Sequence, residues 1–312
     1  MTSPTRRPVV RRWAGATAVI VASGLLLAAC ADGDDPVPAS GETSDPTRTG
    51  KPSPSEEPTA EPPSEAPPEP SGTAVPVYWV GDGPGGESRL FRDFQRVEGD
   101  ALIEAARLVA GGGTATDPDY RTLWPQVEIS SVTATDGVLL VEIPSDAFTE
   151  RPDGMSARQA ELAVQQLVYT LQGVQQERIP VVIERTEAEP RLFGLSTEAE
   201  FTAASALRTL NLVNITSPVE GDTVSGDTLT VTGVANSFEA SGPCRLIAGD
   251  QEVALEGYQA EGWMEDRLFP FEVELPLSGV TGDVVVQCET DDPSGGAEGN
   301  GPSVDTKLIR VQ

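Results

Sequence analysis

The sequence predicts two folded domains of different classes, an α+β domain followed by an all-β sandwich, behind a disordered N-terminal linker. Strand-like runs alternate with two helical runs in residues 74–195, whereas residues 211–312 hold short strand-like runs separated by turn residues. Residues 30–73 are rich in proline and acidic residues and show no apolar periodicity. Residues 196–210 would connect the two domains, and residues 1–29 would precede the linker as a signal peptide.

The composition of the chain excludes several classes of function. The 312 residues carry a formal net charge of −28, which repels nucleic acid, so we expect no nucleic-acid partner. The chain has no histidine, which excludes Ser-His-Asp and Cys-His catalysis and zinc sites with imidazole ligands. Aromatic residues make up only 5% of the chain, which suits modest cores. We expect no cofactor and no metal site.

Residues 1–29 have the parts of an export signal. Four arginines among the first twelve residues form a positive n-region, and residues 14–27 form an apolar run that is too short to span a bilayer of ~30 Å. The run ends in Leu27-Ala28-Ala29-Cys30, which matches the lipobox of bacterial lipoproteins. We expect signal cleavage between Ala29 and Cys30 and lipidation of the Cys30 thiol, with acyl chains such as palmitate. An ordinary cleavage site followed by a chance cysteine is the alternative.

The linker would separate the folded domains from the membrane. Residues 31–72 contain eleven prolines and ten acidic residues, and their only basic residues are Arg48 and Lys51. A flexible coil of this length spans roughly 36 Å. A lipid anchor followed by such a spacer predicts a protein held on the extracytoplasmic face of the cell membrane.

The chain has three cysteines, and lipidation of Cys30 would leave Cys244 and Cys288 as a single pair. A disulfide between them would fit an oxidising compartment. In the chain-entropy treatment, closing the loop between them would stabilise the fold by roughly 4 kcal/mol. Two free thiols are the alternative, because this pairing rests on the cysteine count alone.

The α+β domain is predicted from its strands and from two capped helices. Asp100 is a suitable N-cap for a helix that ends at Ala110, before three glycines. Asp136-Gly137 is a common hairpin turn between two strands. The predicted strands cover residues 75–80, 127–133, 138–143 and 179–184.

The second helix of this domain begins with a capping box. Ser156 and Gln159 have the required spacing of three, and apolar residues follow at spacings of three and four until Gly173, where we expect the helix to end. After the last strand, residues 198–210 show helical spacing of apolar residues and predict an amphipathic connector that packs on the domain.

Several short runs in this domain are similar to those of a known family. They are Val77-Tyr78-Trp79-Val80, Leu90-Phe91, Gly137-Val138-Leu139-Leu140-Val141 and Gln165-Gln166-Leu167-Val168-Tyr169-Thr170-Leu171-Gln172. On these runs, residues 74–195 resemble the GerM-type (GerMN) domain of bacterial envelope and spore-germination proteins. The family supplies no established catalytic residues. The segment Arg185-Thr186-Glu187 departs from the family pattern, which places a turn there.

The second domain shows regularly spaced short strands, and Cys244 and Cys288 would join two of them. The predicted strands are residues 212–215, 229–232, 244–248, 271–275, 284–288 and 307–311.

This second domain also resembles a known module. The matching runs are Ile215-Thr216-Ser217-Pro218, Val231-Thr232-Gly233-Val234-Ala235 with Phe238-Glu239, Gly262-Trp263 with Phe269 and Phe271, and Asp292-Pro293-Ser294-Gly295. Residues 211–312 are therefore similar to the immunoglobulin-like domain that accompanies GerM-type domains in spore-germination and envelope proteins. The resemblance implies an immunoglobulin-like β-sandwich.

Two glycine-rich segments could suggest ligand sites. Residues 81–86 satisfy G-x-G-x-x-G after a strand, but a strand-like run follows instead of the helix that a dinucleotide site needs, so we interpret the segment as a loop. Asp291, Asp292, Glu298 and Asn300 offer oxygen ligands of the kind that calcium prefers. Their spacing matches no calcium loop, and we interpret this segment as an exposed loop as well.

Two further sets of residues bear on an enzymatic function. Glu142, Asp146 and Glu150 lie close together in the sequence, as a carboxylate-dependent glycoside hydrolase would require, although 49 acidic residues produce such groups by chance. Trp79, Trp124 and Trp263 could form a sugar-stacking surface or could be buried in the cores. We expect buried aromatics and assign no catalytic residues.

The sequence thus predicts a membrane-anchored lipoprotein on the extracytoplasmic face, with a non-enzymatic binding or scaffolding role in the bacterial cell envelope. The expected partner is a cell-wall component or an envelope protein. The resemblance to germination modules links this role to sporulation or spore germination. A carboxylate-dependent hydrolase of cell-wall glycan is the alternative.

Overall fold

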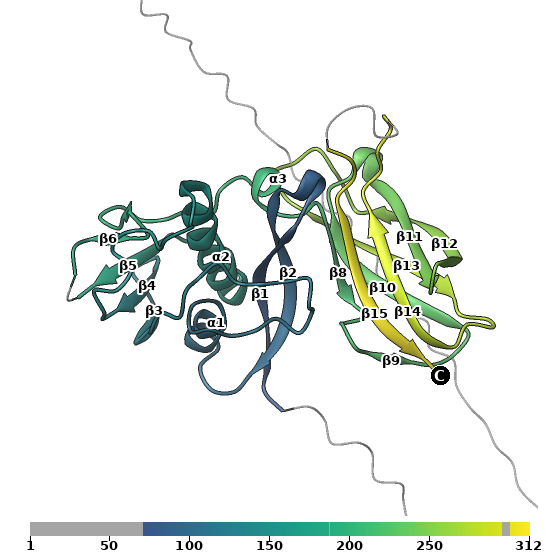
Figure 1. The fold of residues 1–312 in the computed structure, drawn as a ribbon, viewed down its shortest axis with the longest axis horizontal. Helices are drawn as coiled ribbons and strands as arrows, with labels where there is room; N and C mark the ends of the chain where they lie inside the picture. The colour runs from purple at the N-terminus through teal and green to yellow at the C-terminus, as the bar shows by residue number, and fades with distance from the viewer. Residues whose placement is uncertain (1–70, 187, 295–299) are drawn as a thin grey trace, which may run out of the picture. The chain divides into compact units, whose positions relative to one another are not determined.

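The computed structural model describes residues 71–312, except residue 187 and residues 295–299 (Figure 1). The predicted signal peptide, the lipidation site and nearly all of the linker lie outside the described residues. The described residues belong to one compact unit that runs from Ala66 to Gln312. Two large hydrophobic cores form within it, one from residues 75–193 and one from residues 213–311. We call residues 71–210 the first module and residues 211–312 the second module.

The first module has three small sheets, and its two long helices lie between two of them (Figure 1). Strands β1 and β2 pair antiparallel along their whole length, the second sheet has the order β3-β4-β5, and the third is a short hairpin. Strands β4 and β5 run parallel because helix α2 crosses over between them. The main elements are β1 (Thr73–Asp82), β2 (Ser88–Val97), α1 (Ala101–Ala110), β3 (Ser131–Thr135), β4 (Val138–Ile143), α2 (Ala157–Gln175) and β5 (Val181–Arg185).

Both predicted helix starts are confirmed. Asp100 Oδ1 accepts hydrogen bonds from the backbone nitrogens of Leu102 and Ile103, at 2.9 and 3.3 Å. The capping box of α2 is complete, because Gln159 N donates to Ser156 Oγ at 3.2 Å and Ser156 N donates to Gln159 Oε1 at 2.9 Å. Each cap satisfies backbone N–H groups that the first helical turn leaves free.

The end of α2 differs from the prediction. Gly173 lies inside the helix, because its missing side chain permits close packing: a Cβ there would approach Cγ of Pro76 to 2.9 Å. The helix ends instead before Gln176, which takes the left-handed conformation with a φ of 58°. The glycine thus marks a close helix–strand contact.

Two other local predictions are corrected. The predicted strand over residues 127–133 begins later, at Ser131. The amphipathic helix over residues 198–210 is wrong except for one turn, α3 (Ala206–Thr209). Phe201 instead extends along β5, where it exchanges two backbone hydrogen bonds of 2.8 Å with Val181. Two short strands, β6 (Arg191–Leu192) and β7 (Leu195–Ser196), form a hairpin before this segment.

The second module is the predicted β-sandwich. Its strands form a continuous sheet in the order β8-β10-β13-β12-β11-β14-β15-β9, which folds back so that β8 also contacts β14 and β15 across the core. All six predicted strands are present, whereas β9 and β12 were not predicted. The strands are β8 (Val213–Ser217), β9 (Thr223–Val224), β10 (Thr228–Ala235), β11 (Ser241–Ala248), β12 (Gln251–Ala260), β13 (Phe269–Pro276), β14 (Gly282–Glu289) and β15 (Val304–Val311).

Candidate functional site

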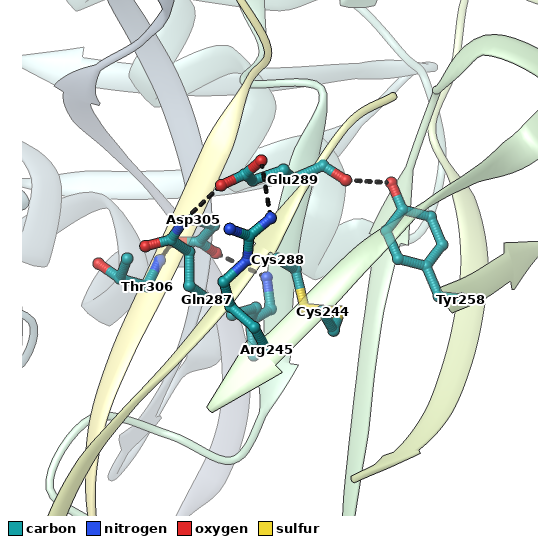
Figure 2. Close-up of a disulfide and its surroundings, with 9 residues drawn as sticks. Cys244, Arg245, Tyr258, Gln287, Cys288, Glu289, Asp305 and Thr306 are labelled. Atoms are coloured by element: carbon teal, nitrogen blue, oxygen red, sulfur yellow. Dashed lines mark hydrogen bonds and ion pairs between the residues drawn. A yellow bond between two sulfur atoms is a disulfide. The ribbon is translucent and has the colours of Figure 1, made fainter. Parts of the chain in front are cut away.

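The structure holds Cys244 and Cys288 in a disulfide between β11 and β14 (Figure 2). The two residues are direct cross-strand partners, and both are fully buried in the core of the second module. Cys288 also lies opposite Asp305 in the register of β14 and β15. The disulfide therefore fixes β14, the strand that pairs with β15. Strand β15 carries two of the charged residues described below.

Arg245 and Glu289 lie on the strand face opposite the disulfide, whereas Tyr258 lies on the core face. Successive side chains of a strand point to opposite faces, so Arg245 and Glu289 point away from the sulfur atoms (Figure 2). Their side chains form a salt bridge of 3.3 Å, and the Tyr258 hydroxyl donates to the Glu289 carbonyl at 2.9 Å. Burial raises the pKa of Tyr258. These contacts tie β11, β12 and β14 together and are structural.

Four charged or polar side chains meet in a buried group, which we call the junction cluster: Asp117, Tyr120, Asp305 and Lys307. Each is at most 7% exposed. Lys307 Nζ donates to Asp117 Oδ2 at 2.5 Å and to the Tyr120 hydroxyl at 2.7 Å, and it lies 3.6 Å from Asp305 Oδ1. The Tyr120 hydroxyl donates to Asp305 Oδ1 at 2.6 Å, and Ile215 N donates to Asp305 Oδ2 at 2.6 Å. Each charged group in the cluster therefore has an opposite charge or a hydrogen bond.

Burial and neighbouring charges shift the pKa values of three residues in the cluster. Burial opposes the charge of Lys307, but the carboxylates of Asp305 and Asp117 outweigh it and raise the Lys307 pKa. Burial also raises the pKa of Asp305, against the effect of the nearby Lys307. Burial and the adjacent Asp305 raise the pKa of Tyr120 well above its usual value, so its hydroxyl stays protonated and donates.

The junction cluster joins the two modules within the compact unit. Asp117 and Tyr120 come from the loop after α1, whereas Asp305 and Lys307 come from β15. Backbone contacts reinforce the joint, because Asn211 N donates to the carbonyl of Leu90 at 2.8 Å. Removing one member of a buried charged group leaves its partner unpaired, which is strongly unfavourable. The two modules therefore behave as one structural unit at this joint.

A cavity of about 310 Å³ is lined by both modules. We call it the arginine cavity, because Arg92, Arg178 and Arg267 line it together with Tyr78 and Tyr169. The two tyrosine rings lie with centroids 5.2 Å apart and tilted by 44°. A neighbouring cavity of about 320 Å³ is lined in part by the same Tyr78 and Arg92. The two cavities share these walls and offer room for a ligand of moderate size.

The candidate carboxylates do not form a shared catalytic group. Glu142 accepts a hydrogen bond of 2.6 Å from the Ser131 hydroxyl, and Glu150 lies 3.5 Å from Arg191. The charge of Asp146 acts on Arg185, whose pKa burial lowers. Each of the three acids therefore has a different neighbour.

The candidate tryptophans do not form a shared surface. Trp79 and Trp124 are buried, as expected, and Trp124 Nε1 donates to the Ala163 carbonyl at 2.6 Å. Trp263 differs, because it is 36% exposed and packs edge-on against the exposed Phe238. A three-tryptophan sugar surface is therefore wrong.

The described residues of the two glycine-rich segments form turns. Residues 84–86 form a single 3₁₀ turn that leads into β2, which confirms the loop interpretation of the G-x-G-x-x-G run. In the other segment Glu298 lies outside the described residues, and Asp292 caps its own turn by accepting from Ser294 N at 3.0 Å. No group of three Asp, Glu or Cys side chains that could hold a metal ion occurs in the described part of the chain. No helix among residues 71–186, 188–294 and 300–312 is long and apolar enough to cross a membrane.

The sequence patterns did not reveal the junction cluster or the arginine cavity. The sequence of β15 contains a pattern that indicates the junction cluster, because Ile309 and Val311 face the core. The period of two then places Asp305 and Lys307 on the same buried face. Charged residues at such positions indicate a buried pair. The cavity has no comparable signal, because its arginines come from three distant segments.

The family comparisons agree with the two modules. Residues 76–188 match a family, Germane, described as "Sporulation and spore germination", and residues 212–297 match a family, Gmad2, described as "Immunoglobulin-like domain of bacterial spore germination". The chain therefore contains a GerM-type domain followed by an immunoglobulin-like domain of the spore-germination class. Both resemblances inferred from the sequence are confirmed.

Comparisons with individual proteins add little. No curated protein matches this chain. One similar solved structure holds the tandem GerMN domains of the sporulation protein GerM from Bacillus subtilis, with 12% identity, a TM-score of 0.34 and coverage of 60% of each chain. Another is an engineered protein, with 17% identity and a TM-score of 0.27; the similarity covers 37% of this chain and 22% of that one. The chain therefore spans less than two thirds of either structure.

Proposed function

We propose that the protein is a lipid-anchored envelope protein whose two modules act together as a non-enzymatic binding unit in a germination- or sporulation-associated process. One observation carries the proposal: a lipobox and an acidic, proline-rich spacer directly precede two domains of the spore-germination class. This order suits a protein that is exported, held at the membrane through Cys30 and extended toward the cell wall.

The structure supports a binding role in two ways. The junction cluster holds the two modules in one unit, so residues from both can form a common site. The arginine cavity is such a common site, because Arg267 and Leu268 of the second module line it beside Tyr78 and Arg92 of the first. The expected partner is a cell-wall component or another envelope protein.

The anchor is tested by replacing Cys30 with alanine. Without the thiol no diacylglycerol can be attached, so the protein should leave the membrane fraction or accumulate as its precursor. The double variant Cys244→Ala/Cys288→Ala is the matched control and should remain with the membranes. Unchanged fractionation of Cys30→Ala, together with an unmodified mass of the N-terminal peptide, would contradict the anchor.

The binding role is tested by cross-linking in intact cells, followed by identification of the wall fragments or proteins that copurify with the full-length protein. Recovery of a defined partner is expected. A hydrolytic role would instead appear as release of soluble glycan from isolated cell walls, and Glu142→Gln would abolish it. Glycan release that depends on Glu142 would overturn the non-enzymatic proposal.

A further inference from the structure

The arginine cavity differs from the rest of this protein in the sign of its charge. The chain has 49 acidic and only 21 basic residues. Three arginines nevertheless line this one cavity, whereas Glu177 is the single acid among its lining residues. Cations that lie together without matching acids repel one another, so an anion in the cavity would relieve this repulsion.

Arg92 is the best-placed cation of the cavity. Its Nη2 donates to the Thr216 hydroxyl at 2.9 Å, which is a neutral acceptor, and its guanidinium lies 5.2 Å from the Phe94 ring centroid. Its Nε is buried and has no acceptor among the residues that the structure describes. Arg92 forms no salt bridge with those residues either. A buried donor without an acceptor is unfavourable, so an anion within reach of this Nε would be stabilised.

Two arginines of the cavity act on the hydroxyl of Tyr78. Burial raises the pKa of its hydroxyl, and the two charged groups that act against this effect are Arg92 and Arg178, both cationic. The Tyr78 hydroxyl itself has no hydrogen-bond partner within the described ranges. Tyr169, its neighbour, is already engaged and donates to the carbonyl of Ala204 at 2.5 Å. The Tyr78 hydroxyl is therefore a free donor, and the charged groups that act on it are two cations.

Some groups near the cavity reduce its positive charge. The C-terminal end of α2 carries a partial negative charge, and its last turn contains no basic residue. Arg267 forms a 2.8 Å salt bridge with Glu265, and the charge of Arg178 also acts on Asp266. These groups leave Arg92 and the Tyr78 hydroxyl unneutralised, with Arg178 at the exposed rim. The positive region is thus small and local.

From this geometry we infer that the arginine cavity binds a single oxyanion, a carboxylate or a phosphate, carried by a cell-wall polymer. Guanidinium groups bind both oxyanions through paired hydrogen bonds. The tyrosine rings and the side chains of Leu210, Leu268 and Val234 would contact a small apolar group beside the anion. A cavity of about 310 Å³ suits a short terminal unit, such as one or two amino acids or a glycerol phosphate. This inference rests on the proposed binding role and names its ligand class.

The site is tested by calorimetric titration of the detergent-solubilised full-length protein with small probes. The probes are acetyl-Ala-Ala with a free carboxylate, the same peptide as its amide, glycerol phosphate and inorganic phosphate. We expect at least one oxyanion probe to bind and the amide not to bind. Binding of the carboxylate peptide assigns a wall peptide, and binding of glycerol phosphate assigns a phosphate polymer. Lack of binding by every oxyanion probe, or equal binding of peptide and amide, would overturn the inference.

Two variants locate the site. Arg178→Ala removes an exposed cation, and Tyr78→Phe removes only a hydroxyl, so each should weaken binding by about tenfold without unfolding the protein. The control is Arg310→Ala, an exposed arginine of β15 that lines neither cavity, and it should bind as the wild type does. Equal affinity for all three variants would place the anion elsewhere.

The outcomes for the site and for the proposed function are separable. Retention of the protein on cell walls with no effect of Arg178→Ala would reject this site and keep the binding role. Probe binding by a protein that copurifies with no envelope component would keep the site and reject the role.

Discussion

Two groups of charged side chains in the compact unit have opposite character. In the junction cluster every charge is buried and meets an opposite charge or a hydrogen bond within 3.6 Å. In the arginine cavity Arg178 and Arg267 are exposed and Arg92 is half-buried, and Arg92 and Arg178 form no salt bridge among the residues described. Charges that neutralise one another hold a structure together, whereas charges that lack partners are free to bind something else. We therefore assign a structural role to the cluster and a binding role to the cavity.

The largest loss of stability is expected from a substitution that disrupts the junction cluster. Lys307→Met should destabilise the protein by about 3–5 kcal/mol, because it leaves Asp117 and Asp305 buried without their counter-ion. Urea denaturation measures the loss. Arg310→Met on the same strand is the matched control. It removes an exposed ion pair with Asp283 and should change the stability by less than about 1 kcal/mol. Equal effects of both variants would contradict the role of the cluster.

The next largest loss of stability is expected when the disulfide between β11 and β14 is removed. Loss of the Cys244–Cys288 disulfide should destabilise the protein by about 2–4 kcal/mol, because the bridge restricts the unfolded chain. Denaturation with and without a reducing agent measures this effect on an unchanged sequence. Non-reducing peptide mapping should recover Cys244 linked to Cys288. Two free thiols in freshly exported protein would show that the bridge does not form.

Alkaline pH should lower the stability that the junction cluster gives to the folded protein. Lys307 and Tyr120 have raised pKa values in the folded chain, so the folded state keeps protons that the unfolded state releases. Their contribution to stability is fully present below about pH 10 and is lost as the pH rises above it. Stability measured between about pH 9 and pH 11 should fall, and the fall should be shallower in Lys307→Met. Identical slopes in both proteins would contradict this linkage.

The smallest expected effect concerns the cavity. Arg178→Ala should change the free energy of unfolding by no more than about 0.5 kcal/mol, because the side chain is exposed and has no salt bridge among the described residues. A denaturation curve that overlays the wild type is expected. A large loss of stability would show that Arg178, like Lys307, serves the fold.

Much of the fold could be predicted from local patterns. The caps at Asp100 and Ser156 and the turn at Asp136-Gly137 act through neighbouring backbone groups, so the sequence alone reveals them. Gly173 and the segment from residue 198 to 210 misled the prediction, because tertiary packing against Pro76 and β5 decided their conformation. Local propensity is a weak guide where such contacts decide.

The candidate sites were harder to predict than the fold. The disulfide followed from a count of three cysteines, and its position on adjacent strands needed the structure. Lys307 and Asp117 are 190 positions apart, and the arginines of the cavity come from β2, the loop after α2 and the loop before β13. Contacts of this range depend on the complete fold, so single-sequence patterns do not reveal them.

The most direct test of the contrast between the cluster and the cavity is co-sedimentation with isolated cell walls. The detergent-solubilised full-length protein is compared with Arg178→Ala and Arg310→Ala, all three being equally stable. The account predicts that the wild type and Arg310→Ala sediment alike, and that Arg178→Ala binds about tenfold more weakly. Equal sedimentation of Arg178→Ala and Arg310→Ala would contradict the claim that the arginine cavity is the binding surface.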